Sequence, residues 1–320
     1  MQNEYEKEND NDNNGGAFGR LVVSLILAIG VFCLIGLIAN SGEGRMNIPY
    51  GEEARDCQVS EERMDSLDNK LRDYVAQIDG QWSVYVKDLR HGLTLSMNNE
   101  PMYAASLIKI YVMESTYAHM DTVLDNASAL YGEDEAQTIV DMLLENMIAR
   151  SDNDSFNELV RLHSANHSFT EGAEYINAYL SEQGYKDTII FHTLHPAESE
   201  PEAISDNPGD LNETSVKDCG LLLDRIYNNE CVSYDASQAM LSLLSMQEND
   251  TKIHAGIADA KKIANKTGET DKQQHDVAIV YTTDRDYILC IMSTALTSED
   301  EEAGIENVKN VASLVGKTLT

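Results

Sequence analysis

The order of hydrophobic patterns along the chain most constrains the fold. Strand-like apolar runs occupy residues 82–89 and 93–97, and such runs return only at residues 276–283 and 287–294. Between them, residues 105–257 show mostly helical spacing. Because strands must pair with one another, this order predicts an α/β fold. One antiparallel sheet would be built from both ends of a domain, with an all-helical lobe inserted between them.

Helical segments flank the two groups of strands. Apolar side chains recur at spacings of three and four within residues 61–78, and we expect a last helix at about residues 302–315. The domain should therefore cover residues 60–320. Its sheet layer, with the terminal helices, would come from residues 60–104 and 259–320, and its helical lobe from residues 105–258.

An uncharged, mostly apolar run of nineteen residues, 21–39, precedes this domain. At about 1.5 Å rise per residue it spans roughly the hydrocarbon thickness of a bilayer, so it predicts one transmembrane anchor. The alternative is a cleavable signal peptide, which has a shorter apolar stretch and a clearer cleavage site. Residues 1–20 would form a short polar tail, and residues 40–59, rich in glycine and charge, a tether.

The composition excludes several classes of protein. In 320 residues, 55 acidic side chains against 23 basic ones give a formal net charge of −32, which repels nucleic-acid phosphates. An apolar fraction of 42% excludes a disordered chain, and five cysteines are too few for a disulfide scaffold. Cys219 and Cys231 lie across an expected helix roughly 16 Å long, so we expect free thiols.

Ser106 and Lys109 stand three positions apart at the start of an expected helix. Residues with this spacing share a helix face, so the lysine amine can reach the serine hydroxyl. A basic neighbour that accepts its proton makes serine a nucleophile, and a helix N-terminus stabilises a developing oxyanion. The pair alone carries little information, because it arises about once by chance in a chain of this length.

Two further motifs follow along the chain. Ser151, Asp152 and Asn153 come after a helical apolar run, and they offer a hydroxyl for proton relay and an amide for binding. The alternative interpretation is a helix cap, since all three residue types are good caps. Lys266, Thr267 and Gly268 lie on an expected strand, where they present a cation and a hydroxyl to a carboxylate while glycine allows close backbone approach.

In this order the three motifs resemble those of the class A β-lactamases and the related penicillin-binding serine acyltransferases. The resemblance runs from about Trp82 to Thr294, and it includes SVYVKDLRHGLTLSMNNEPMYAASLIK around the first motif and HDVAIVY after the third. It implies that Ser106 is the acylated nucleophile and Lys109 its base or proton partner. Ser151 would pass the proton to the leaving nitrogen.

The resemblance also implies the binding residues. Asn153 would orient the substrate side chain, and Lys266 and Thr267 would hold a substrate carboxylate. Next to Gly268, the backbone N–H of Glu269 would complete an oxyanion hole with the N–H of the nucleophile. The extra carboxylate of Glu269 should weaken the binding of an anionic lactam, or suit a substrate that bears an ammonium group.

Hydrolysis of the acyl-enzyme implies a further glutamate that activates water. The segment ESEPEAISDNPGDLNETS resembles the family's loop for this step, and the candidate in it is Glu200. Two positions depart from the family pattern. Ile204 stands where the family usually has an asparagine that helps to hold the water, and Glu198 stands at the position of the usual arginine.

We therefore expect a membrane-anchored β-lactamase-like serine hydrolase, monomeric and outside the cytoplasmic membrane, because β-lactams and cell-wall peptides are met there. The alternatives are a D,D-peptidase or transpeptidase acting on peptidoglycan stem peptides, and a penicillin sensor that does not hydrolyse. No metal or organic cofactor is expected. His163 and His167 have helical metal-ligand spacing, but no third ligand is evident.

Overall fold

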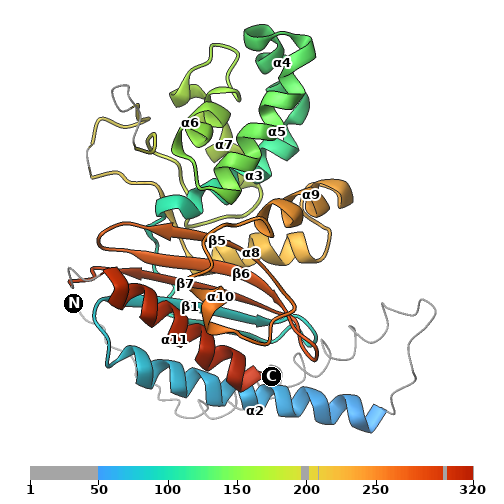
Figure 1. Ribbon diagram of the computed structural model, residues 1–320, viewed down its shortest axis with the longest axis vertical. Helices are drawn as coiled ribbons and strands as arrows, with labels where there is room; N and C mark the ends of the chain where they lie inside the picture. The colour runs from blue at the N-terminus through green and yellow to red at the C-terminus, as the bar shows by residue number, and fades with distance from the viewer. Residues whose placement is uncertain (1–49, 196–201, 208, 298–300, 320) are drawn as a thin grey trace, which may run out of the picture. The chain divides into compact units, whose positions relative to one another are not determined.

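The computed structural model describes residues 50–195, 202–207, 209–297 and 301–319. Its contacts divide the chain into residues 1–55 and 56–320, and the second unit contains the fold analysed below (Figure 1). The expected polar tail at 1–20 and the expected anchor at 21–39 lie outside the described residues. Among the helices of the described ranges, none is both long enough and apolar enough to cross a membrane.

A five-stranded antiparallel sheet forms the centre of the domain, in the order β2-β1-β7-β6-β5. The strands are β1 (Gln81–Asp88), β2 (Thr94–Met97), β5 (Lys262–Glu269), β6 (Gln274–Tyr281) and β7 (Tyr287–Thr294). Val84 of β1 pairs with Ile291 of β7, so strands from the two ends of the domain lie side by side. The predicted antiparallel sheet from both chain ends is therefore confirmed.

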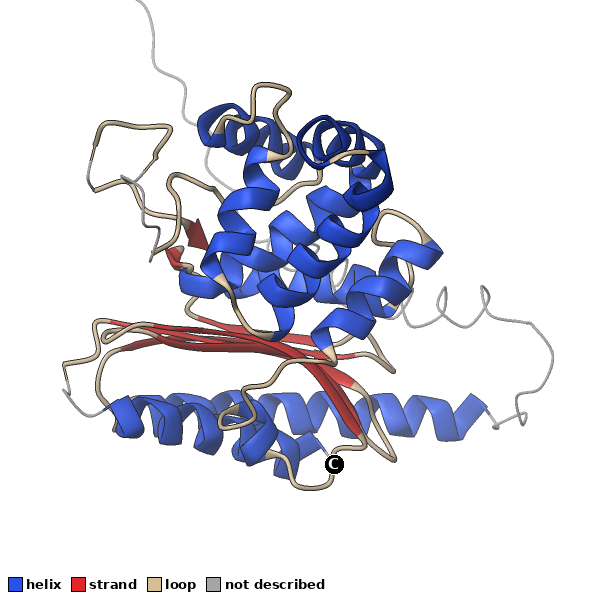
Figure 2. Cartoon of the chain, turned by 45° about the horizontal axis from the view of Figure 1, so that its top comes forward, coloured by secondary structure: helices blue, strands red, loops and turns tan. Residues whose placement is uncertain are grey.

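Helices from both ends of the domain cover one face of this sheet (Figure 2). They are α2 (Tyr50–Val75), α10 (Ile253–Gly256) and α11 (Glu301–Leu319). Leu67 of α2 and Val311 of α11 pack with Val84 and Leu289 of the strands in one fully buried apolar cluster. The alternation of strand side chains explains this face, because the neighbours of these residues point to the opposite side.

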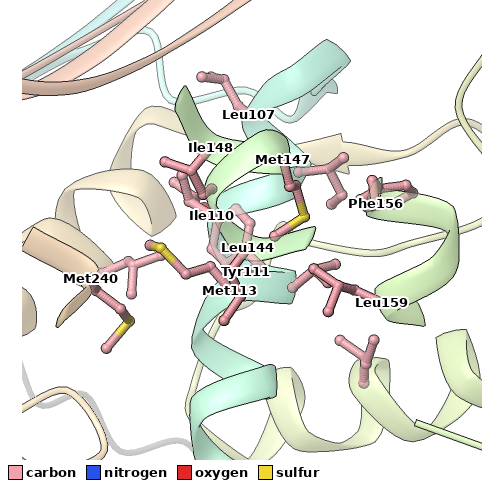
Figure 3. Close-up of a cluster of buried hydrophobic side chains, with 14 of the residues drawn as sticks. Leu107, Ile110, Tyr111, Met113, Leu144, Met147, Ile148, Phe156, Leu159 and Met240 are labelled. Atoms are coloured by element: carbon pink, nitrogen blue, oxygen red, sulfur yellow. The ribbon is translucent and has the colours of Figure 1, made fainter. Parts of the chain in front are cut away.

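The helical lobe covers the other face and has its own core, which Figure 3 shows around Leu107, Tyr111 and Phe156. Its helices are the 3-10 turn η1 (Ala105–Ile108), α3 (Lys109–Ala118), α4 (Met120–Tyr131), α5 (Glu133–Ala149), α6 (Asn153–Arg161), α7 (Phe169–Glu182), α8 (Val216–Tyr227) and α9 (Tyr234–Leu244). Every residue from 109 to 116 in α3 is buried, so neighbouring helices fix this helix on all sides.

Close packing of α8 joins the lobe to the sheet. A Cβ atom at Gly220 would lie only 2.4 Å from the ring of Tyr85 on β1, so only glycine lets the helix approach this closely. A two-stranded sheet, β3 (Met102–Tyr103) with β4 (Glu213–Thr214), lies next to η1. One strand of this pair, β4, therefore lies within residues 105–258, which the sequence predicts to be all helical, while β3 lies in the segment predicted to belong to the sheet layer.

Two segments differ in structure from what their predicted boundaries suggest. The predicted tether, residues 40–59, overlaps α2, which begins at Tyr50. The first turns of α2 have no apolar stripe that would predict a helix. Polar contacts stabilise them instead, such as those of Asp56 and Ser60 with Arg285. The lobe was extended to residue 258, but Ile253 and Ile257 are buried in the cluster with α11 on the opposite face of the sheet.

Candidate active site

Ser106 lies in the turn η1, directly before the buried helix α3. Ala105 has a φ of 46°, a left-handed conformation that side chains rarely adopt, so the backbone turns sharply in front of Ser106. Lys109 Nζ lies 3.0 Å from Ser106 Oγ, as the spacing of the two residues predicts. The Lys109 side chain is fully buried, so bulk water does not solvate its amine.

The second motif connects α5 to α6. Asp152 is the N-cap of α6, and its carboxylate accepts a hydrogen bond from the Ser155 backbone N–H at 2.7 Å. The predicted capping interpretation therefore holds for Asp152, while its two neighbours face Lys109. Lys109 Nζ donates to the Ser151 carbonyl oxygen at 2.5 Å and to Asn153 Oδ1 at 2.6 Å, and lies 3.2 Å from Ser151 Oγ.

The third motif reaches the same point from strand β5. Lys266 Nζ donates to Ser151 Oγ at 2.8 Å and to the Thr267 carbonyl oxygen at 2.8 Å. A Cβ atom at Gly268 would lie 3.2 Å from the backbone nitrogen of Ser106. Glycine at this position therefore lets the edge strand run directly past the amide of Ser106. Thr267 is buried in the same strand.

Burial controls the charge of both lysines. Desolvation lowers the pKa of Lys109 to about 7, against a smaller opposing effect of the Asp152 carboxylate. Burial also lowers the pKa of Lys266 well below its usual range, and the charges of Lys109 and Lys252 act in the same direction. A large fraction of Lys109 is therefore neutral near pH 7 and can accept a proton.

The hydrogen-bond partners of Lys109 determine what its neutral amine can do. A neutral amine has two N–H donors and one lone pair. The carbonyl oxygen of Ser151 and the amide oxygen of Asn153 can only accept, so they take the two donors. The lone pair is then left for a hydroxyl, either that of Ser106 at 3.0 Å or that of Ser151 at 3.2 Å. A hydrogen bond from the Ser106 hydroxyl to this lone pair is the arrangement that general-base activation requires.

Lys252 is a neighbour of the site that the sequence interpretation missed. Its ammonium group is fully buried and lies 3.0 Å from Glu269 Oε2, 3.3 Å from the His275 carbonyl oxygen and 3.5 Å from the Gly268 carbonyl oxygen. No pattern in the sequence marks this lysine, because the strand that it contacts lies more than a dozen residues further along the chain.

Glu200 and Glu198 lie outside the described residues, but both stems of their loop are described. Asn157 of α6 pairs with the backbone of Leu194 in both directions: its amide donates to the Leu194 carbonyl at 3.0 Å, and its oxygen accepts from the Leu194 N–H at 2.8 Å. On the returning stem, the Ile204 N–H donates to the Phe191 carbonyl at 2.8 Å. The loop is therefore anchored on the helix that carries Asn153.

Solved structures of three proteins share this fold. A β-lactamase from Xanthomonas campestris superposes with a TM-score of 0.64 at 17% identity, over 81% of this chain and 99% of that chain. A β-lactamase from Sphaerobacter thermophilus superposes with a TM-score of 0.60 at 19% identity, over 78% of this chain and 94% of that chain. A mutant of PBP-A, solved as an acyl-enzyme complex with penicillin G, superposes with a TM-score of 0.62 at 21% identity, over 79% of this chain and 96% of that chain.

The sequence itself matches the beta-lactamase enzyme family over residues 66–319. The chain therefore belongs to this family, and it is a β-lactamase-like serine hydrolase. A comparison with curated proteins gives no match. The family resemblance predicted from the three motifs is confirmed.

Proposed function

We propose that this protein is a membrane-anchored enzyme that hydrolyses β-lactams outside the cytoplasmic membrane through an acyl-enzyme on Ser106. One observation carries the proposal: a continuous set of hydrogen bonds runs from Ser106 through Lys109 and Ser151 to Lys266. The apolar run at residues 21–39 supports the anchor, and the location follows from where β-lactams are encountered. The enzyme would act as a monomer.

Acylation would follow from the geometry of these groups. The neutral amine of Lys109 takes the hydroxyl proton while Ser106 Oγ attacks the lactam carbonyl carbon. The backbone N–H groups of Ser106 and Glu269 stabilise the resulting oxyanion. The proton then passes from Lys109 to Ser151 Oγ, 3.2 Å away, and from there to the lactam nitrogen as the C–N bond breaks. Asn153 orients the substrate side chain, and Lys266 and Thr267 bind the substrate carboxylate.

Deacylation would depend on Glu200 as the base that activates water. The anchoring of Leu194 to Asn157 and of Ile204 to Phe191 would hold the intervening loop beside α6. Since Ile204 cannot hydrogen-bond a water molecule through its side chain, the water would be less firmly held than by an asparagine. We therefore expect slow hydrolysis.

A second candidate is a D,D-peptidase or transpeptidase on cell-wall stem peptides, or a penicillin sensor, which would keep the acyl group. One observation favours it: Ile204 stands where the family usually has an asparagine that helps to hold the deacylating water, and Glu198 stands at the position of the usual arginine. The fold it shares with PBP-A is compatible with this candidate. The two candidates use the same acylation residues and differ only in the fate of the acyl-enzyme.

The test is to incubate the full-length protein in detergent with a fluorescent penicillin and to follow the labelled band. A β-lactamase gives rapid labelling that clears, whereas a transpeptidase or sensor gives labelling that persists. Ser106→Ala should abolish labelling in either case. If the parent protein takes up no label, or if Ser106→Ala labels as fast as the parent, the proposal is wrong.

Glu200→Gln separates the two candidates further. If Glu200 activates the water, this variant should acylate at the parent's rate and then retain the label. Glu202→Gln is the matched control, because it removes a carboxylate two positions away whose partner is Arg161 on α6. A Glu200→Gln adduct that clears as fast as the parent's would exclude Glu200 as the deacylation base.

A further inference from the structure

Glu269 and Lys252 form an ion pair beside the third motif. The Lys252 side chain has no exposed surface, while the Glu269 side chain is 41% exposed. The other carboxylate oxygen of Glu269 accepts a hydrogen bond from Asn249 at 3.4 Å. The carboxylate therefore has a donor at each oxygen, and it is the only member of the pair that meets solvent.

The pair lies next to the acylation machinery. Glu269 follows Gly268, whose Cα faces the amide of Ser106, and Lys252 also contacts the Gly268 carbonyl. The charges of Lys252 and Glu269 both affect Lys266, in opposite directions. The electrostatic potential at the end of β5 therefore depends on whether the charge of Lys252 is neutralised.

Two carboxylates, Glu269 and Asp276, interact with the buried lysines at this end of β5. Burial and neighbouring positive charges favour the uncharged form of Lys266, so its attraction for an anion is reduced. Lys252 already has a carboxylate partner in Glu269. A substrate carboxylate that enters here must either compete with Glu269 for Lys252 or lie beside a like charge.

We propose that Glu269 acts as an internal counter-anion for Lys252, so that this site favours substrates that are uncharged at the position where penicillins carry a carboxylate. The inference rests on the proposed function, since it concerns the substrate of the same acylation. Glu269 is a specificity-determining residue through its side chain, which is separate from the role of its backbone N–H.

The test compares two compounds that differ only at this carboxylate, benzylpenicillin and its uncharged methyl ester. The added methyl group is the same for every variant, so a change in the ratio between variants reports the charge. The quantity measured is the ratio of their second-order acylation rate constants on Ser106 of the full-length protein, acid over ester. Glu269→Gln keeps the shape of the side chain and removes its charge. We expect the ratio to rise about tenfold, and to rise less at high salt because the carboxylate is partly exposed.

Asp271→Asn is the matched control. Asp271 is exposed, stands two residues after Glu269, and has no hydrogen bond or ion pair shown within the described residues. The Asp271→Asn substitution removes one negative charge from the same part of the surface. If the effect of Glu269 depends on its pair with Lys252, the acid-over-ester ratio of Asp271→Asn should stay within about twofold of the parent's. An equal rise in Asp271→Asn would show a general effect of net charge and would overturn the proposal.

Lys252→Met tests the pair from its other side. Without the cation, Glu269 is an uncompensated anion, so the ratio should fall below the parent's, and adding Glu269→Gln should reverse the fall. Melting temperatures show whether this variant folds; the Glu269→Gln result decides the proposal if it does not. An unchanged ratio in Glu269→Gln, with both compounds acylating Ser106, overturns the inference alone. No acylation by either compound overturns the proposed function and the inference with it.

Discussion

At the scale of single residues, the reactivity proposed for Ser106 would depend on the burial of one amine. Lys109 has no carboxylate hydrogen-bonded to it within the described ranges, and its four polar neighbours are neutral oxygens. An ammonium group in this position is penalised, because neutral acceptors replace only part of the solvation that water gives. The burial of Lys109 thus lowers the stability of its charged form, and it leaves a neutral amine that can accept the serine proton.

The pH dependence of acylation follows from this amine. With a pKa of about 7, Lys109 is mostly protonated at lower pH and cannot accept the serine proton. The acylation rate constant should therefore rise with pH through about 7 and fall about tenfold per pH unit well below it. Stopped-flow labelling with a penicillin from pH 5.5 to 8.5 measures this. A flat profile over that range contradicts the assignment.

At the scale of elements, α6 connects stability to the site. Its N-cap, Asp152, fixes the first turn, and the residues on either side of the cap both contact Lys109. Ser151 has a φ of 59°, so the chain adopts a left-handed conformation between α5 and this cap. The surrounding contacts must stabilise this unfavourable conformation, and the cap is one of them.

Asp152→Ala should therefore affect both properties. We expect a loss of about 1 kcal/mol in the free energy of unfolding, as for other helix caps, together with a slower acylation of Ser106. Urea unfolding and penicillin labelling measure the two effects. Asp152→Asn should restore most of both, because asparagine also caps helices.

Ser168→Ala provides the comparison. Ser168 is the N-cap of α7 and accepts a hydrogen bond from the Glu171 N–H, but it takes no part in the contacts around Lys109. It should lose a similar stability while acylation continues at the parent's rate. If both cap variants slow acylation equally, the effect of Asp152 is general loosening of the lobe and not the placement of Ser151.

Sequence patterns predicted the long elements well, and the short ones poorly. Strands such as β6 and β7 can be predicted from the sequence because a run of eight apolar-rich residues bounded by polar turn residues is typical of a buried strand. Strands β3 and β4 contain two residues each and exist only because distant segments meet, so no local pattern marks them. The contact of Lys252 with Glu269 was missed for the same reason, although Glu269 itself was recognised as unusual.

At the scale of the whole domain, a buried polar cluster ties its beginning to its end. Arg285, in the turn after β6, donates to Asp88 at the end of β1 at 2.8 Å and to Asp56 of α2 at 3.3 Å. Ser60 and His91 complete the cluster. Asp88 is almost fully buried, and its hydrogen bonds together with the positive charge of Arg285 keep its pKa below its usual range in spite of desolvation.

Arg285→Met should destabilise the domain strongly. It leaves the carboxylate of Asp88 buried without its main cation, a change that costs about 3 kcal/mol or more in buried pairs. Urea unfolding of the full-length protein at neutral pH measures the loss. Lys309→Met removes a cation from the exposed pair with Glu306 and should change stability by less than about 0.5 kcal/mol. Equal losses in the two variants contradict the interpretation.

The hydrogen bond from Lys266 to Ser151 connects the edge strand β5 to the helical lobe. The sheet contributes to two apolar cores, one with its outer helices and the other with the lobe. The proposed chemistry would therefore take place where the edge of the sheet meets the lobe. A displacement of about one ångström between the sheet edge and the lobe would break the hydrogen bond from Lys266 to Ser151 and is expected to slow acylation, although every helix and strand would stay intact. An acyl group that contacts both the sheet edge and the lobe would stabilise their contact for as long as it remains attached to Ser106.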